Sequence, residues 1–297
     1  MKYFNVYNGL IPLSNNEISD EIYDTVLENY NIIETYFRVE QLLYILIANY
    51  NELCVELNKI TLKNFIEGSI DKDIAIDITN VNWKLLNLSA SFKCYLDQIK
   101  GSRSFGGDYN PGLFEEIEPA LHKKILDKLE DIKENDKDAQ YLYDIRNEIQ
   151  HNNLPMQYVG MSRNIIGKED DKTRIINMTF NKEFASNDYV RVGNGLQSLF
   201  DLHYDIIRKY YFDMFYNAKK DYIEFINQYI EPDENRLMIL FDDEKEDSEK
   251  QYITRDYLNR VHKLIDKNPE RKPKVKGWFP GIINVADIEE NKKKLRS

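Results

Sequence analysis

The chain has 297 residues, of which 42% are hydrophobic and 31% are charged, and its formal net charge at pH 7 is −11. This length and composition exclude a disordered or collagen-like chain and suffice for one large domain or two small ones. The negative charge excludes a protein that coats nucleic acid or an anionic membrane with its whole surface. Any polyanion must therefore be bound at a local site.

The cysteine content and the lack of long apolar segments indicate where in the cell the protein is located. Cys54 and Cys94 form no Cys-x-x-Cys pair, which excludes a disulfide framework and a thiolate zinc site and favours two small core residues in a reducing environment. The first residues lack the apolar stretch of a signal peptide, and no segment approaches about 20 uninterrupted apolar residues. We therefore expect a cytoplasmic protein with no membrane partner.

The first half of the chain predicts three helices. A capping box from Ser14 to Glu17, followed by apolar residues at steps of three and four, predicts one long helix that reaches about Leu57. The same spacing predicts helices over residues 81–99 and 114–132, with Gly101 as the stop after the earlier one.

A shorter fourth helix is predicted over residues 138–152, because Leu142, Ile145 and Ile149 share one face and Pro155 forbids continuation. Weak period-two segments at 156–161 and 174–180 then predict two short strands or an extended excursion of about thirty residues, over residues 156–187. A last long helix is predicted from a cap at 186–188 to Tyr229.

Together these elements predict a mainly all-α fold, an antiparallel helical bundle with a short β-like excursion and a small C-terminal appendage. The composition changes near residue 231, so we expect the bundle to span residues 1–230 and the appendage residues 231–297. The appendage contains a possible strand at 236–241, an acidic run and a basic tail. Residues 255–297 carry a net charge of +6, which leaves −17 for the rest.

The end of the fourth predicted helix carries the most informative motif, Arg146-Asn147 followed four residues later by His151. Helical spacing places Arg146 at the border of the buried face, where a guanidinium needs a partner or a functional reason. Asn147 and His151 are i,i+4 neighbours, so the amide can hydrogen-bond one ring nitrogen and orient the imidazole. A positioned imidazole beside a fixed cation suits phosphodiester chemistry without a metal.

This arrangement resembles the R-N-x-x-x-H signature of the HEPN superfamily, the helical domains of many prokaryotic ribonuclease toxins and phage-defence effectors. The resemblance covers roughly residues 17–230 in architecture and residues 85–155 in recognisable motif. It implies a metal-independent endoribonuclease, with no cofactor, in which the 2′-hydroxyl of the RNA attacks the adjacent phosphorus and leaves a 2′,3′-cyclic phosphate. By the same resemblance, His151 moves protons, Arg146 offsets the charge on phosphorus and Asn147 orients the ring.

The resemblance also implies a homodimer in which two such helix ends meet, and an antitoxin or another defence-system component as a further partner. Two other interpretations stay open. One is a non-catalytic HEPN-fold module that binds nucleotide or RNA or assembles proteins; the other is a structural adaptor in which Arg146 is salt-bridged within its own bundle. Arg255 and His262 match the bare spacing too, but without the asparagine, and they suit a surface pair on a short helix.

Further RNA contacts are predicted outside this motif, each with a simpler structural alternative. Arg103 lies in a glycine-rich segment at 101–107 that either cradles a phosphate or merely connects two helices. Lys272, Lys274, Lys276 and Trp278 either follow an RNA backbone and stack on a base or form a solvated tail. The aspartates at 71, 73 and 77 lack the glycine and glutamate of a calcium loop, so we expect no metal site. His122 and His203 fit buried structural positions.

Overall fold

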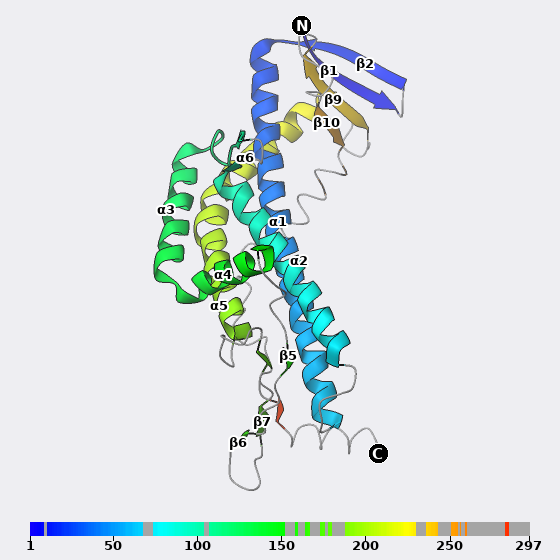
Figure 1. Ribbon diagram of the computed structural model, residues 1–297. Helices are drawn as coiled ribbons and strands as arrows, with labels where there is room; N and C mark the ends of the chain where they lie inside the picture. Colours follow the sequence, from blue (N-terminus) through cyan, green and yellow to red (C-terminus); the bar gives the residue numbers. More distant parts are fainter. Residues whose placement is uncertain are drawn as a thin grey trace. The chain divides into compact units, whose positions relative to one another are not determined.

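The protein is described from a computed structural model, which defines residues 1–8, 11–67, 74–103, 107–151, 158–159, 164–166, 173–175, 178–179, 188–229, 236–242, 251–254, 256, 259 and 283–284. The fold is mainly α-helical, as the sequence predicts (Figure 1). Its helices are α1 (Asp20–Glu67), α2 (Ile74–Lys100), α3 (Pro119–Asn135), α4 (Lys137–His151), α5 (Asp188–Leu202) and α6 (Lys209–Ile226), with a π-helical segment, η1 (His203–Arg208), before α6.

The N-terminus is a β-hairpin and not the beginning of a helix. Strands β1 (Lys2–Asn8) and β2 (Ile11–Ile18) pair antiparallel, so Ser14 and Glu17 lie within β2 and the predicted capping box is wrong. The helix starts one turn later, where the Ser19 Oγ accepts a hydrogen bond from the Ile22 N–H at 3.3 Å. Two acidic residues in the first turn of α1 favour this start, because they face the positive end of the helix dipole.

The hairpin belongs to a four-stranded antiparallel sheet of order β10-β9-β1-β2, in which β9 is Leu237–Asp242 and β10 is Gln251–Thr254. β9 confirms the strand predicted at 236–241. Phe4 lies opposite Leu240, and both side chains are fully buried. The Phe4 ring also packs edge-on against Phe225 of α6, with centroids 4.8 Å apart. The sheet thus joins residues from both sides of position 231.

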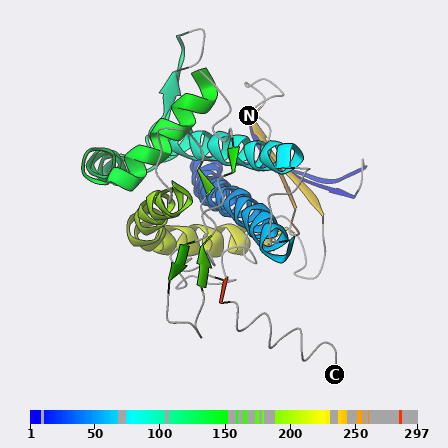
Figure 2. The same ribbon diagram turned by 60° about the horizontal axis from the view of Figure 1, so that its bottom comes forward.

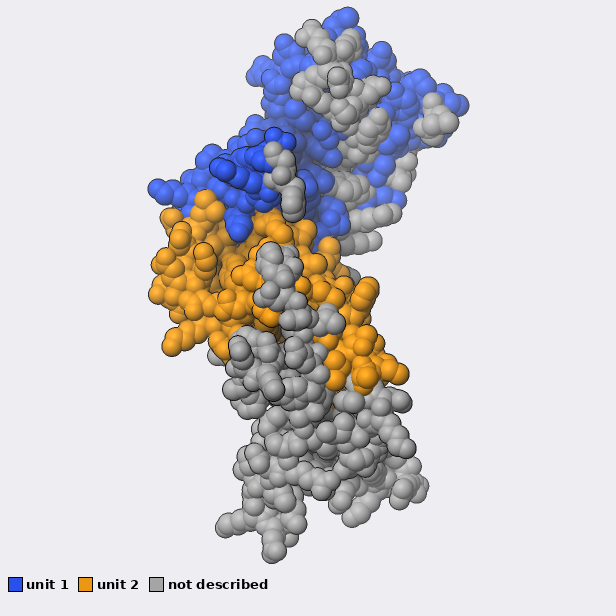
Figure 3. Space-filling view, in the orientation of Figure 1, with its two compact units in different colours: residues 1–41, 98–124, 204–271 blue, residues 42–97, 125–203, 272–297 orange. Residues whose placement is uncertain are grey.

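The described chain divides into two compact units, each built from separate stretches of sequence (Figure 3). Unit 1 comprises residues 1–41, 98–124 and 204–271, and unit 2 comprises residues 42–97, 125–203 and 272–297. Because unit 1 contains residues on both sides of position 231, this division does not coincide with the change in composition there.

Unit 1 has an aromatic core and one buried ion pair. The Tyr36 ring stacks on Phe215 at 4.8 Å and on Tyr211 at 5.6 Å. Beside it, Arg208 donates two hydrogen bonds to the carboxylate of Glu40, at 3.1 and 2.9 Å, and both side chains are almost fully buried. Arg208 is the last residue of η1, a π-turn that the sequence pattern did not predict, because apolar steps of three and four continue through it.

Unit 2 is organised around α2, which runs antiparallel to the second half of α1 (Figure 2). The Lys84 Nζ lies 2.6 Å from the Glu52 Oε2, and the Asn80 amide donates to Glu56 at 3.4 Å. Both segments predicted to be extended contain short strands, since β5 (Tyr158–Val159) pairs with β8 (Met178–Thr179), but the segment predicted at 174–180 contains parts of two strands. Two further pairings involve β7 (Thr173–Ile175), with β6 (Asn164–Ile166) and with β11 (Ile283–Asn284).

The histidine predictions are confirmed and one cysteine prediction is wrong. His122 and His203 are buried, and the His203 Nδ1 lies 2.9 Å from the Tyr95 hydroxyl. Cys54 is buried as predicted, whereas Cys94 is exposed on α2. Within the described ranges, none of the helices combines the length and apolar composition that crossing a bilayer requires.

Candidate functional site

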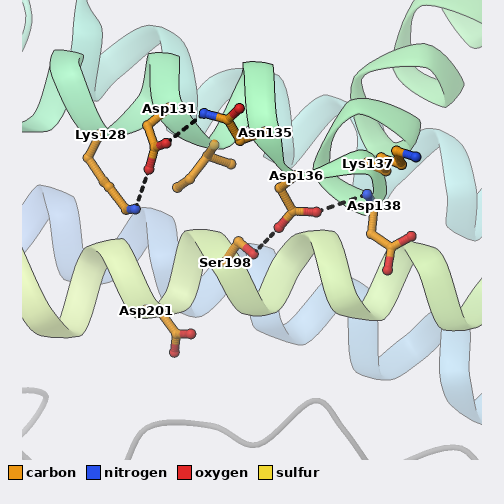
Figure 4. A pocket seen from close by; sticks show the side chains of 9 residues that line it. Lys128, Asp131, Asn135, Asp136, Lys137, Asp138, Ser198 and Asp201 are labelled. Carbon is orange, nitrogen blue, oxygen red and sulfur yellow. Dashed lines mark hydrogen bonds and ion pairs between the residues drawn. The ribbon is translucent and has the colours of Figure 1, made fainter.

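The helix that carries the predicted site, α4, is fixed first at its N-terminus. One carboxylate oxygen of Asp136 accepts hydrogen bonds from the N–H groups of Asp138 and Ala139, at 2.9 and 3.0 Å, and the other accepts from the Ser198 hydroxyl of α5 (Figure 4). Burial alone would raise the pKa of Asp136, but these hydrogen bonds outweigh it and leave the pKa below its usual value. Asp136 is therefore the N-cap of α4 and ties it to α5.

The first turn of α4 also lies very close to α5. Asp138 accepts hydrogen bonds from the Arg191 Nε at 3.1 Å and the Asn194 Nδ2 at 2.7 Å. A Cβ atom at Gly195 would lie only 2.6 Å from the backbone oxygen of Asp138. The absence of a side chain at Gly195 is therefore what allows the two helices to approach each other here.

The middle of α4 packs against α2 and α5 through its apolar face, as the sequence predicts. Leu142 and Ile145 are buried, and together with Arg146 they line a cavity of about 10 Å³, which is room for about one water molecule. The opposite wall consists of residues from α2 and α5, namely Leu85, Leu88, Ser89 and Val192. Of these wall residues, Ser89 alone carries a polar side chain.

Arg146 is partly exposed at the edge of this cavity. Its guanidinium donates a hydrogen bond from NH1 to the Asn147 Oδ1 at 2.7 Å. Across the part of the chain that the structure describes, no carboxylate lies within ion-pair distance of Arg146, so its positive charge is not neutralised there. A purely structural adaptor would have required a salt bridge between Arg146 and a carboxylate of its own bundle. The contact with Asn147 is not a salt bridge.

His151 is the last residue of α4, five positions after Arg146. At 1.5 Å per residue the two Cα atoms are separated by roughly 7.5 Å along the helix axis. The side chain of His151 lies outside the described residues, so its contact with Asn147 stays a prediction. An asparagine can serve both neighbours, because its oxygen accepts from Arg146 while its amide nitrogen donates.

The other predicted RNA-binding residues belong to unit 1 or lie outside the described residues. Arg103 is exposed in β3 (Ser102–Arg103), which pairs with β4 (Tyr109–Asn110), and it belongs to unit 1, whereas Arg146 belongs to unit 2. The four candidates in the basic tail, Lys272, Lys274, Lys276 and Trp278, lie outside the described residues.

An open acidic pocket of about 460 Å³ lies beside the start of α4, and Figure 4 shows the side chains that line it. Its aspartates are occupied by the protein itself: Asp131 accepts from Lys128 and Asn135, and Asp201 accepts from Gln197. Over the described ranges, no three histidine, cysteine, aspartate or glutamate residues are grouped to hold a metal ion. We therefore regard this pocket as part of the support of α4.

Comparison of the chain with models of protein families, with curated proteins and with solved structures found no match. The residues of the site are therefore the basis on which a function can be proposed. The sequence located the catalytic candidates but not their supports, Asp136, Asp138 and Gly195. The signal for Asp136 was present in the charged turn before α4, since an aspartate directly before the first helical residue is a typical N-cap.

Proposed function

We propose that the chain is a HEPN-type, metal-independent endoribonuclease whose site is the C-terminal end of α4, formed by Arg146, Asn147 and His151. The observation that carries the proposal is Arg146: a partly buried guanidinium with no carboxylate partner among the described residues, held by Asn147 at the helix end that also bears His151. An unneutralised cation fixed beside an imidazole suits a reaction that develops negative charge on a phosphoryl group.

In the proposed reaction the 2′-oxygen of a ribose forms a bond to the adjacent phosphorus, and the bond from phosphorus to the 5′-oxygen breaks. A base accepts the proton of the 2′-hydroxyl, and an acid donates a proton to the departing 5′-oxygen, so the products are a 2′,3′-cyclic phosphate and a 5′-hydroxyl. His151 performs one of these transfers, and the guanidinium of Arg146 stabilises the charge on the non-bridging oxygens.

A single helix end supplies one imidazole, whereas the reaction uses both a base and an acid. A homodimer with two α4 ends in one cleft would supply both. We further propose that the protein acts in the cytoplasm as a toxin or phage-defence effector, with RNA as substrate and an antitoxin or another defence-system protein as partner. RNA binding should be weak outside the cleft, because a net charge of −11 repels the phosphate backbone.

The first prediction is that purified protein cleaves single-stranded RNA in the presence of EDTA and leaves 2′,3′-cyclic phosphate ends. His151→Ala should lower the cleavage rate by about 100-fold or more, the usual effect of losing a general acid or base, and Arg146→Ala should do the same. Gel analysis of end-labelled RNA, with enzymatic identification of the ends, measures both the rate and the products.

Arg255 and His262 form a second arginine–histidine pair in the chain, and this pair provides a matched control. The variants Arg255→Ala and His262→Ala remove the same residue types at a similar spacing. Both variants should keep the wild-type rate. Equal activity of the His151→Ala and wild-type proteins would overturn the proposal. RNA binding that survives Arg146→Ala and His151→Ala, with no turnover by any form of the protein, would instead favour the non-catalytic binding module.

A further inference from the structure

Unit 2 has a second surface that the proposed reaction does not use, on the solvent side of the α1/α2 pair. Five large apolar side chains are exposed there, and none of them packs into the core. They are Tyr44, Ile45 and Val55 on α1 and Ile76 and Trp83 on α2, with exposed fractions between 49% and 66%. Single exposed apolar residues are ordinary, but a group of this size on two neighbouring helices is not.

The two sets of residues lie on the same side of the helix pair. The seam between α1 and α2 is marked by the ion pair of Glu52 with Lys84, and the Glu52 side chain is itself 55% exposed, so the seam opens to solvent. Val55 lies one turn from Glu52 on α1, and Trp83 precedes Lys84 on α2. Val55 and Trp83 therefore flank one solvent-facing seam, and Tyr44, Ile45 and Ile76 are exposed further along the same two helices. We call these five residues the α1/α2 face.

The α1/α2 face is also unusually poor in net charge for a chain with 31% charged residues. On α2 the outward positions at helical spacing are all uncharged, namely Ile76, Thr79, Trp83, Asn87, Ala90 and Cys94. On α1 the two charged residues among the apolar ones are each paired with an opposite charge, Glu52 with Lys84 and Lys59 with Glu56. Another molecule with the same charge can thus approach this face without repulsion from it.

The size of the face fits a stable interface. Five such side chains, each exposed by about half or more, present on the order of 500 Å² of apolar surface. A stable protein–protein interface covers roughly 800 Å² on each partner, so these side chains alone would make up more than half of it. Trp83 and Tyr44 are also of the types that dominate interface energetics.

We propose that the α1/α2 face is a self-association interface whose occupant is the same face of a second copy of this chain. Two copies related by a two-fold axis would bury both faces at once, helix pair against helix pair. This interface is separate from the α4 end, because the α2 residues that border Arg146 (Leu85, Leu88 and Ser89) lie on the opposite side of α2 from Trp83. The proposal does not depend on ribonuclease activity.

Trp83 provides a direct test, because association would transfer its indole from water into an apolar contact. In a Trp278→Phe background, Trp83 is the single tryptophan. Its emission should shift to shorter wavelength as the protein concentration rises, in parallel with an increase in mass by sedimentation. Val55→Glu, on the same face, should abolish both changes. Leu13→Glu is the matched control, since Leu13 is also more than half exposed (54%, against 66% for Val55) but lies on β2 in unit 1, and it should leave both unchanged.

Circular dichroism of each variant would establish that the helices are intact. The proposal is overturned if the Trp83 emission remains that of a water-exposed indole at every concentration, even if the protein dimerises. That outcome would assign the dimer to another surface, such as the α4 end. The proposal is also overturned if the Val55→Glu variant still self-associates and its Trp83 emission still shifts as in the protein with Val55.

Discussion

At the scale of single residues, the structure separates two kinds of charged group near α4. Asp136 and Asp138 accept hydrogen bonds from backbone and side-chain donors of the protein, and these bonds hold α4 in place. Among the described residues, the guanidinium of Arg146 donates to the uncharged amide of Asn147 and meets no carboxylate. The first two are expected to contribute to stability, and the last to function.

Asp136 can be tested by comparing two substitutions. Asp136→Ala removes the cap of α4 and should lower the free energy of unfolding by about 1–2 kcal/mol, as measured by urea denaturation at neutral pH. Asp136→Asn keeps a capping oxygen and should cost less. A loss in the asparagine variant as large as in the alanine variant would show that the charge, and not the cap, matters.

The lowered pKa of Asp136 also predicts a pH dependence. A carboxyl group whose pKa is lower in the folded than in the unfolded protein binds its proton more weakly when folded. Its contribution to stability is therefore complete above the usual value of 3.8 and is lost as the pH falls through the lowered value. The urea midpoint should fall less steeply between about pH 5 and about pH 3 in Asp136→Asn than in the wild-type protein.

At the scale of elements, the position of α4 depends on the close approach of α5. Replacing glycine by alanine inside a helix ordinarily stabilises it by roughly 1 kcal/mol. At Gly195 the opposite sign is expected, because the new Cβ would lie 2.6 Å from the Asp138 backbone oxygen and the helices would have to separate. Gly195→Ala should therefore lower the thermal midpoint, and a raised midpoint would show that α5 moves without cost.

Several elements could be predicted from the sequence because their signal is local. α4 was located to within one residue at each end, and β9 was recognised from its apolar run. The N-terminal hairpin was missed, because Ser14 and Glu17 carry a helix-start motif while the partner that makes β1 a strand lies near residue 240. Local spacing contains no information about such a partner, and the same is true of the contact between Gly195 and Asp138.

At the scale of the whole molecule, the Glu40–Arg208 ion pair connects residues that are far apart in the sequence. Both side chains are almost fully buried, so removing one partner leaves the other as a buried charge without this ion pair. Arg208→Met or Glu40→Gln alone should lower the free energy of unfolding by about 3–5 kcal/mol, whereas the two together should cost less than the sum.

The exposed pair of Lys220 and Glu224 on α6 serves as the control for this cycle. Its side chains are 72% and 65% exposed, and Glu224→Gln should change stability by less than about 0.5 kcal/mol. Additive effects of the two core substitutions in urea denaturation would contradict the proposed coupling between Glu40 and Arg208.

The sheet order β10-β9-β1-β2 has a consequence for how the protein is made. β1 is synthesised well before β9, but its central position in the sheet is completed only when β9 emerges. Until then the hairpin has an open edge on the ribosome, and closing so large a loop is slow. The hairpin of β1 and β2 should thus gain its protection against hydrogen exchange later than the helices that are translated before β9.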